Sequence, residues 1–222
     1  MISKWNNAFT NHSYLRIGFV ILILLSLVKF NFAQTVFDEE GWELAKDKDG
    51  IKIYTRQMKG MKLKEFKALS SMYTTVENII HVLLDIDNYD QWTVNVKNSR
   101  LLSTVSENET YVYSVANTPW PFANRDIINH IHVYWSPTRD TATLVIDGVP
   151  DYLPEKKGII RMPVSKGEWH IYQITEEKVN IEYSYAVDPA GAIPAWVVNM
   201  FIVDGPYKTL LMMKDYIESA NK

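Results

Sequence analysis

Residues 193–219, IPAWVVNMFIVDGPYKTLLMMKDYIES, have the period of a long helix with one apolar face. At about 100° per residue, the large apolar side chains fall within one arc. Gly205-Pro206 interrupts the stretch, and proline both lacks an amide hydrogen and clashes with the preceding turn. We therefore expect a bend or a loosened turn there. The apolar arc of the predicted helix consists of Trp196, Met200, Val203, Tyr207, Leu210, Leu211 and Ile217.

A series of strand patterns precedes this helix. In residues 51–56, isoleucines alternate with lysine and tyrosine, as in a half-buried strand. Turn sequences such as SENE (106–109) and SPTRD (136–140) separate later strands, and connections this short join antiparallel neighbours. The predicted strands cover residues 51–56, 63–72, 100–105, 110–116, 126–135, 141–149, 159–163, 167–174 and 180–187.

Two shorter segments also have helical patterns. Residues 75–84, TVENIIHVLL, place their aliphatic side chains on one face, and Thr75 can cap the helix. Residues 38–46 predict a short helix that begins at Asp38, and residues 85–92 predict a helical turn and a loop. With no linker dividing the chain, the sequence predicts one α+β domain, in which a curved antiparallel sheet wraps around the long C-terminal helix.

The first 33 residues differ from the rest of the chain. Residues 17–28 are apolar except for a glycine and a serine, and Lys4 and Arg16 flank them. A helix of this length spans about 18 Å, which is short of the roughly 30 Å hydrocarbon core of a membrane. We therefore predict a secretory signal peptide in residues 1–33, with Ala33 near the cleavage point, and an exported (periplasmic or secreted) protein. A membrane anchor at residues 15–33 and a buried start of the fold are the alternatives.

Charge and cysteine content exclude several classes of function. The 222 residues have a net charge of −3; three of the 23 basic residues and none of the 26 acidic ones lie in residues 1–33, which leaves the remainder at −6. An acidic body without a Lys/Arg stripe argues against nucleic-acid binding. The absence of cysteine excludes disulfides, thiolate catalysis, a lipoprotein anchor and cysteine-based metal sites.

Six short strings occur in an order that resembles one known family. They are DGIKIYTR (49–56), KEFKA (64–68), YDQWTVNVK (89–97), PWPFANRD (119–126), LPEKKGIIR (153–161) and DPAGAIPAWVVN (188–199). Together they resemble the START (steroidogenic-acute-regulatory-related lipid transfer) family over residues 42–217. The resemblance implies a helix-grip fold, with a START-like lipid-binding domain at residues 38–222 and an internal tunnel for one lipid.

The resemblance implies binding and transfer of a lipid or other hydrophobic small molecule, without catalysis or a cofactor. An acyl chain gains about 0.8 kcal/mol for each methylene that leaves water, so an apolar cavity can extract it from a membrane. Transient membrane contact is expected, and the oligomeric state is left open. As in the family, the terminal helix at residues 193–217 would act as a lid, together with the loop at residues 149–157.

Alternation along the strands suggests which side chains face the ligand. Residues 127–135 present an apolar set (Ile127, Asn129, Ile131, Val133, Trp135), residues 110–116 the bulky set Tyr111, Tyr113 and Val115, and residues 180–187 the set Ile181, Tyr183, Tyr185 and Val187. Plain core packing is the alternative for each of them. The predicted ligand-binding residues are Trp92, Tyr111, Tyr113, Trp120, Phe122, Arg125, Asn129, Ile131, Val133, Tyr183, Trp196, Met200 and Val203.

Charged and polar positions refine the ligand class. Arg125 can hold a phosphate or carboxylate headgroup, or form a structural ion pair with Asp126 or Glu155, and Arg161 is similarly ambiguous. Sterol-carrying members of the family place an acidic and a basic residue in the cavity. The corresponding positions here hold an asparagine (residue 98) and an isoleucine (residue 131), which favours a phospholipid, a fatty acid or another apolar metabolite over a sterol.

Alternative functions have weaker sequence support. His130 and His132 share a strand face and can chelate a metal with a third ligand such as His170, although an exposed polar strand face has the same pattern. A cyclase or hydrolase on the same fold, or a membrane-tethered lipid sensor, remains open. The chain lacks the GxSxG, phosphate-loop and HExxH motifs, and we assign no catalytic or metal-ligating residue. Asn108 begins an N-x-T glycosylation motif.

Overall fold

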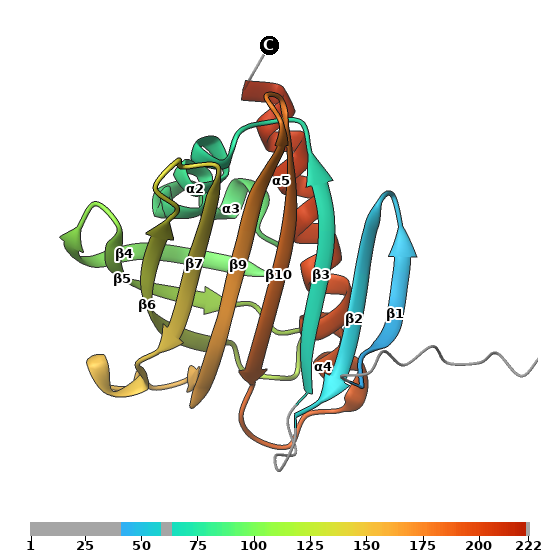
Figure 1. Ribbon diagram of the computed structural model, residues 1–222. Helices are drawn as coiled ribbons and strands as arrows, with labels where there is room; N and C mark the ends of the chain where they lie inside the picture. Colours follow the sequence, from blue (N-terminus) through green and yellow to red (C-terminus); the bar gives the residue numbers. More distant parts are fainter. Residues whose placement is uncertain (1–40, 59–63, 221–222) are drawn as a thin grey trace, which may run out of the picture. The chain divides into compact units, whose positions relative to one another are not determined.

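A strongly curved sheet wraps around the C-terminal helix in the computed structural model, which describes residues 41–58 and 64–220 (Figure 1). This arrangement confirms the predicted α+β class and the helix-grip fold. The strands are β1 (Glu43–Lys48), β2 (Ile51–Gln57), β3 (Lys64–Met72), β4 (Val96–Ser106), β5 (Glu109–Ala116), β6 (Arg125–Trp135), β7 (Thr141–Gly148), β8 (Ile160–Arg161), β9 (Val164–Thr175) and β10 (Lys178–Asp188). The helices are α2 (Val76–Leu84), α3 (Tyr89–Trp92), α4 (Ala195–Asn199) and α5 (Gly205–Ala220), with 3₁₀ turns at Ile86–Asn88 and Pro150–Tyr152.

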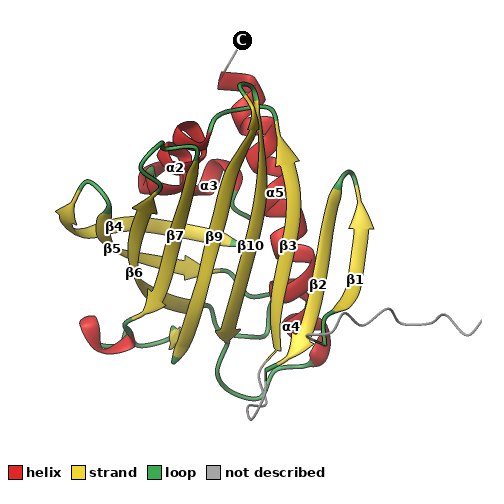
Figure 2. Cartoon of the chain, viewed as in Figure 1, coloured by secondary structure: helices red, strands yellow, loops and turns green. Residues whose placement is uncertain are grey.

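The strand order is β1-β2-β3-β10-β9-β7-β6-β5-β4, and every neighbouring pair on this path is antiparallel, as the short connections predict. The two-residue β8 differs, because it pairs in parallel with the start of β6. The sheet bends so strongly that β4 and β5, at one end of it, pass behind β7 and β9 in the view of Figure 2. Its concave face therefore surrounds the helices.

The predicted helix at residues 38–46 is wrong within the described residues, because residues 43–48 form the edge strand β1. β1 pairs with β2 through a two-residue turn at Asp49-Gly50, where both residues have positive φ, at 53° and 74°. Such a turn matches the twist of paired strands, and Asp-Gly favours it. Pairing across this hairpin therefore outweighs the weak local helix pattern.

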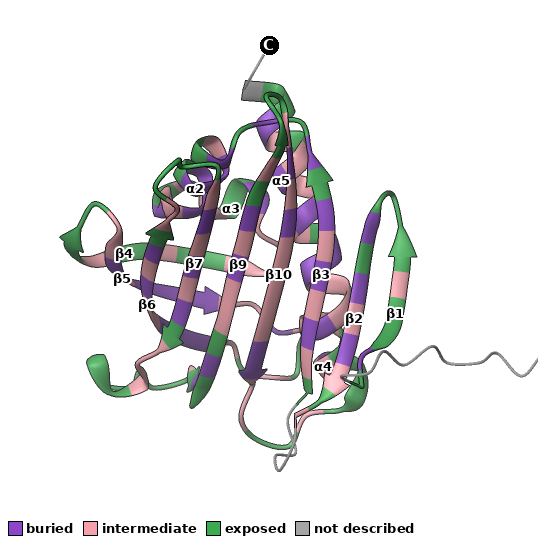
Figure 3. Cartoon of the chain, in the orientation of Figure 1, coloured by how far each residue is buried: buried purple, intermediate pink, exposed green. Residues whose placement is uncertain are grey.

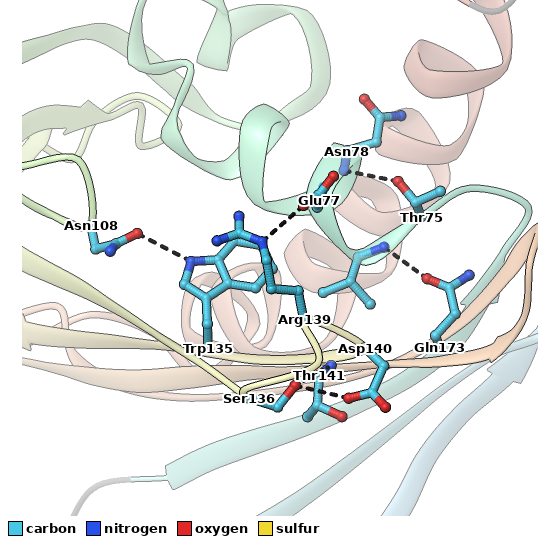
Figure 4. Close-up of polar contacts among 11 residues, drawn as sticks. Thr75, Glu77, Asn78, Asn108, Trp135, Ser136, Arg139, Asp140, Thr141 and Gln173 are labelled. Carbon is cyan, nitrogen blue, oxygen red and sulfur yellow. Dashed lines mark hydrogen bonds and ion pairs between the residues drawn. The ribbon is translucent and has the colours of Figure 1, made fainter.

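Helix α2 forms as predicted and is anchored at its N-terminus. The Thr75 hydroxyl accepts a hydrogen bond from the Asn78 amide at 3.2 Å, and Gln173 of β9 accepts one from the Val76 amide at 3.1 Å. Arg139, in the β6–β7 turn, pairs with Glu77 at 2.9 Å and lies over the Trp135 ring (Figure 4). These contacts hold α2 against the end of β7 and β9.

The terminal helix is continuous but changes its winding where the sequence predicts a disturbance. A π-helical turn at Met200–Asp204 separates α4 from α5, and the Gly205 amide donates to the Met200 carbonyl five residues earlier. Pro206 has no amide hydrogen for a regular bond to the fourth preceding residue, so the helix widens just before it. A side chain at Gly205 would lie 2.8 Å from the Met200 carbonyl oxygen, which is why glycine is required there.

The apolar arc of α5 faces the sheet (Figure 3). Tyr207, Leu210, Met213 and Ile217 are buried in one core cluster with residues of α2, β2, β3 and β10. No helix of residues 41–58 and 64–220 is long and apolar enough to cross a membrane. The predicted leader or anchor in residues 1–33 lies outside the described residues.

Candidate functional site

A cavity of about 200 Å³ lies between the concave face of the sheet and the terminal helix. Its floor comes from β5, β6, β7, β9 and β10, and its other walls come from α3, the segment after α3, the π-helical turn and the start of α5. The walls are mostly aliphatic and aromatic. They include Phe66, Val112, Ile127, Leu144, Ile146, Met162, Trp169, Val187 and Phe201.

Five of the predicted ligand-binding residues lie in the cavity wall: Trp92, Asn129, Ile131, Tyr183 and Met200. On β6 and β10, the alternation correctly assigns the inner face, since Ile127, Tyr185 and Val187 also line the cavity. Tyr183 is held by its ring, which stacks on Trp169 at 3.9 Å between centroids. Burial raises the pKa of the Tyr183 and Tyr185 hydroxyls, so both stay protonated at neutral pH.

The expectation that Tyr111 and Tyr113 face the cavity is wrong. Pairing with β6 places Tyr111 opposite His130 and Tyr113 opposite Ile128 on the outer face, so Val112 and Ser114 of β5 line the cavity instead. The larger side chains lie outside because this part of the outer face is itself covered by protein. Size alone therefore misassigns the inner face of β5.

The loop at residues 149–157 provides this cover and does not lie over the cavity. Tyr152 stacks on Tyr111 with 4.7 Å between ring centroids, and Val149 and Leu153 pack against the cluster that contains Tyr113. Lys156 donates to the Tyr113 hydroxyl at 3.1 Å. The prediction that this loop is a second lid is therefore wrong, because it is fixed to the opposite face of the sheet.

Five other predicted residues also lie outside the cavity wall. Val133 is buried in the core and does not line the cavity. Val203 belongs to the π-helical turn but lines a separate polar groove beside β1 and β2. Trp120 is 91% exposed and Trp196 is 54% exposed, and Phe122 packs edge-on against Trp196. Trp120 and the half-buried Phe122 lie in the connection between β5 and β6, and Trp196 lies near the start of α4, so none of the three enters the core.

Arg125 is fully buried but points away from the cavity. It donates to the backbone carbonyls of Ala123, Pro189 and Ala190, with 3.0 Å to Pro189, and it has no ion pair with Asp126 or Glu155. Burial lowers the pKa of its guanidinium. Both expectations for Arg125, a headgroup ligand and an ion pair, are thus replaced by a backbone clamp.

Arg161 forms the ion pair instead. Its guanidinium contacts both carboxylate oxygens of Asp126, at 2.8 and 3.1 Å, and the two side chains are 4% and 1% exposed. The same group donates to the carbonyls of Pro150 and Leu153. Arg161 therefore fastens the covering loop to β6 and has a structural role.

Sequence reasoning did not reveal a polar network at the cavity wall, which includes Asn129 and Tyr185. Ser165 of β9 donates to the Asn129 side-chain oxygen at 2.7 Å and shares a hydrogen bond with the Tyr185 hydroxyl. Gly148 and Gly167 make room for it, because a side chain at either would collide with Ser165 or with the Tyr185 ring. Glycine within a strand signals such a close approach, and it was the available clue.

Three polar contacts hold the terminal helix to the rest of the domain, one of them at the cavity. The Val94 amide, after α3, donates to the Thr209 hydroxyl of α5 at 3.2 Å. Lys46 of β1 pairs with Asp204 at 2.6 Å, and Tyr207 donates to Asp49 in the β1–β2 turn. All three join elements that are distant in sequence, so local patterns do not reveal them.

The two histidines of β6 lie on the outer face. His130 is 2.8 Å from one oxygen of Glu109 and His132 is 3.9 Å from the other, whereas His170 contacts Glu168 and Thr143. Within residues 41–58 and 64–220, no group of three or more histidine or carboxylate side chains is arranged to hold a metal. The Asn108 side chain accepts a hydrogen bond from the Trp135 indole at 3.1 Å.

Comparisons with known proteins agree with this architecture. The model of the START domain family matches residues 27–214. An uncharacterized protein from Pseudomonas aeruginosa is 31% identical over 202 residues, which cover 90% of this chain and 98% of that protein. The phosphatidylcholine transfer protein of Rattus norvegicus is 27% identical over 177 residues, with 74% and 78% covered. The crystal structure of a STAR-related lipid transfer protein from Xanthomonas axonopodis is 34% identical and has a TM-score of 0.72, with 80% of this chain and 99% of that chain covered. The chain therefore belongs to the START domain family.

Proposed function

We propose that this protein binds a lipid or another hydrophobic small molecule in the cavity and carries it between membranes without chemical change. The observation that carries the proposal is an apolar cavity of about 200 Å³. Protein interiors are normally close-packed, so a cavity of this size suggests a place for a ligand. The names of the relatives, which include a phosphatidylcholine transfer protein and a STAR-related lipid transfer protein, support it.

We expect the terminal helix to open for exchange. The cavity is smaller than the roughly 300–1,000 Å³ of pockets for drug-sized ligands, so a lipid with long chains requires it to expand. Met200, Phe201 and Pro206 belong both to its wall and to the irregular part of the helix. A π-helical turn beside a proline has weaker backbone bonding than a regular helix, which lowers the cost of opening there.

Two exposed tryptophans and one half-buried phenylalanine form a candidate membrane-contact surface. Trp120 and Phe122 lie in the β5–β6 connection, and Trp196 lies at the start of α4. Phe122 and Trp196 are 6.2 Å apart between ring centroids, so the two segments meet. Tryptophan favours the membrane interface because its ring is apolar and its N–H remains hydrated. Docking here would place the opening helix against the membrane.

Export completes the proposal, because the apolar residues 17–28 with their basic flank favour a secretory signal, with membrane anchoring by residues 15–33 as the alternative. Transport would then take place outside the cytoplasm. N-terminal sequencing of the exported protein distinguishes cleavage from anchoring.

Native mass spectrometry of the full chain tests cavity binding. We expect one bound lipid per chain after incubation with mixed-lipid vesicles, and loss of that lipid in Ile146→Trp, which fills the cavity. Val145→Trp is the matched control. Val145 is the neighbour of Ile146 in β7, but it pairs with His132 and lies on the outer face of the sheet, outside the cavity wall. Thermal unfolding of both variants checks the fold. A wild-type chain that acquires no lipid would contradict the proposal.

Vesicle sedimentation tests the membrane-contact surface. Replacing Trp120 and Trp196 with serine is expected to lower partitioning to phosphatidylcholine vesicles at least tenfold, since a large apolar side chain contributes about 1.5–3 kcal/mol when it leaves water. Tyr172→Ser, at an exposed aromatic position on β9, is the control. Equal partitioning of the double variant and the wild type would exclude this surface.

A further inference from the structure

The wall of the cavity contains no charged side chain. Among the described residues that line it, none is an aspartate, glutamate, lysine, arginine or histidine. The arginine that the sequence offered for a headgroup, Arg125, is committed to backbone carbonyls elsewhere. A charged group that enters such a cavity loses its hydration without gaining a partner of opposite charge, which is strongly unfavourable.

The wall also contains hydrogen-bond donors, among them the Trp92 indole and the Tyr183 hydroxyl. The indole N–H of Trp92 is buried without a partner, although the residue is only 3% exposed. The Tyr183 hydroxyl has no hydrogen-bond partner among the described residues, whereas the neighbouring Tyr89 and Tyr185 hydroxyls have theirs. A buried donor left unpaired is unfavourable, so an acceptor that reaches the Trp92 N–H as the cavity widens recovers that cost. The Tyr183 hydroxyl is not fully buried and offers an ordinary hydrogen bond.

The two donors sit on parts of the fold that hold them in place. The Trp92 ring packs edge-on against Tyr89, with 5.0 Å between centroids, and the Tyr183 ring lies between Phe66 and Trp169. Because these rings are fixed, the donors are presented to the ligand at little cost in side-chain entropy. Donors without a compensating positive charge suit an uncharged acceptor, such as a carbonyl oxygen.

We propose that the cavity selects an uncharged lipid whose polar group is a carbonyl-type acceptor, such as a fatty-acyl ester, and that Trp92 and Tyr183 donate hydrogen bonds to it. Lipids whose phosphate or carboxylate must enter the cavity are excluded by the same wall. The inference rests on the proposed function, because it names the class of lipid carried by the same cavity.

Three ligands with one identical oleoyl chain test the proposal. Monooleoylglycerol and oleoyl-lysophosphatidylcholine share the ester but differ in the charged headgroup, and oleate is an anion at about pH 8. Their affinities for the full chain are measured by displacement of the uncharged fluorophore N-phenyl-1-naphthylamine, below the concentrations at which the lipids form micelles. We expect monooleoylglycerol to bind at least tenfold more tightly than either charged ligand.

The donor role is tested with Tyr183→Phe, which keeps the stacked ring and removes only the hydroxyl. We expect a roughly three- to tenfold weaker affinity for monooleoylglycerol and an unchanged affinity for the fluorophore, which has no carbonyl. Tyr134→Phe, at an exposed position on the outer face of β6, is the matched control. Trp92→Phe is the second variant and should weaken the same ligand.

Each outcome decides between the two proposals. Equal or tighter binding of the lysophospholipid or of oleate would overturn the selection of uncharged lipids while lipid binding itself stands. An equal loss for all ligands and the fluorophore in Tyr183→Phe would show that the residue acts only by packing and would overturn its donor role. Failure of the wild type to bind any of the three, together with no lipid in native mass spectrometry, would reject the proposed function itself.

Discussion

The hydrogen bond from the Val94 amide to the Thr209 hydroxyl is the most direct test of an opening terminal helix. It is 3.2 Å long and joins the segment after α3 to α5, and both residues line the cavity. If lipid exchange requires the helix to leave this segment, the bond must break each time. Thr209→Val keeps the shape of the side chain and removes the acceptor, so we expect it to accelerate exchange.

The size of the effect follows from the value of one hydrogen bond. A neutral intramolecular bond contributes about 0.5–1.5 kcal/mol net, which corresponds to roughly a two- to twelvefold change in an equilibrium constant. The same bond is lost in opening with and without lipid. Association and dissociation rates should therefore rise by the same factor, and the dissociation constant should stay unchanged.

Stopped-flow transfer of pyrene-labelled monoacylglycerol between the protein and phosphatidylcholine vesicles measures both rates. Thr143→Val is the control, because its hydroxyl bonds to His170 on the outer face of β7 and β9. Unchanged rates in a stably folded Thr209→Val would show that this contact persists during exchange and would refute the opening mechanism. A changed dissociation constant with an unchanged association rate would instead identify Thr209 as a ligand contact.

Two further substitutions probe the scaffold and the helix. Arg161→Met leaves the buried Asp126 carboxylate without its partner and should lower the free energy of unfolding, measured with denaturant, by about 3–5 kcal/mol. The control Arg139→Met removes an exposed ion pair and should lower it by at most about 1 kcal/mol. Similar losses of stability in the two variants would contradict the structural role of Arg161. Pro206→Ala supplies the amide that can bond to the Ile202 carbonyl, so we expect a regular α-helix, higher thermal stability and several-fold slower lipid transfer, and a transfer rate equal to wild type would remove the π-helical turn from the mechanism.

Local patterns predicted most of the fold because they act over a few residues. The Thr75 cap, the alternating isoleucines of β2 and the disturbance at Gly205-Pro206 all depend on near neighbours, and each lies where the sequence indicates. The edge strand β1 was missed because its strand character comes from pairing with β2. Short-range preference is a weak guide wherever long-range pairing contributes more.

The candidate site was predicted only in part, and β5 shows why. Alternation separates Tyr111 and Tyr113 from Val112 and Ser114, but it does not indicate which set is inside when protein covers both faces. Arg125 and Arg161 present the same difficulty, because the sequence does not show which of the two arginines pairs with Asp126. Only the parallel pairing of β8 with β6 brings Arg161 to that carboxylate.

The amino-acid sequence by itself determined the α+β class, the order of most elements and the long apolar helix at the C-terminus, because hydrophobic periodicity is written residue by residue. Only the tertiary structure decided that a cavity lies between the sheet and the terminal helix, that the buried Trp92 indole has no partner, and that no described residue of the cavity wall is charged. An empty volume is what remains after all surrounding elements have packed, and so no single segment encodes it.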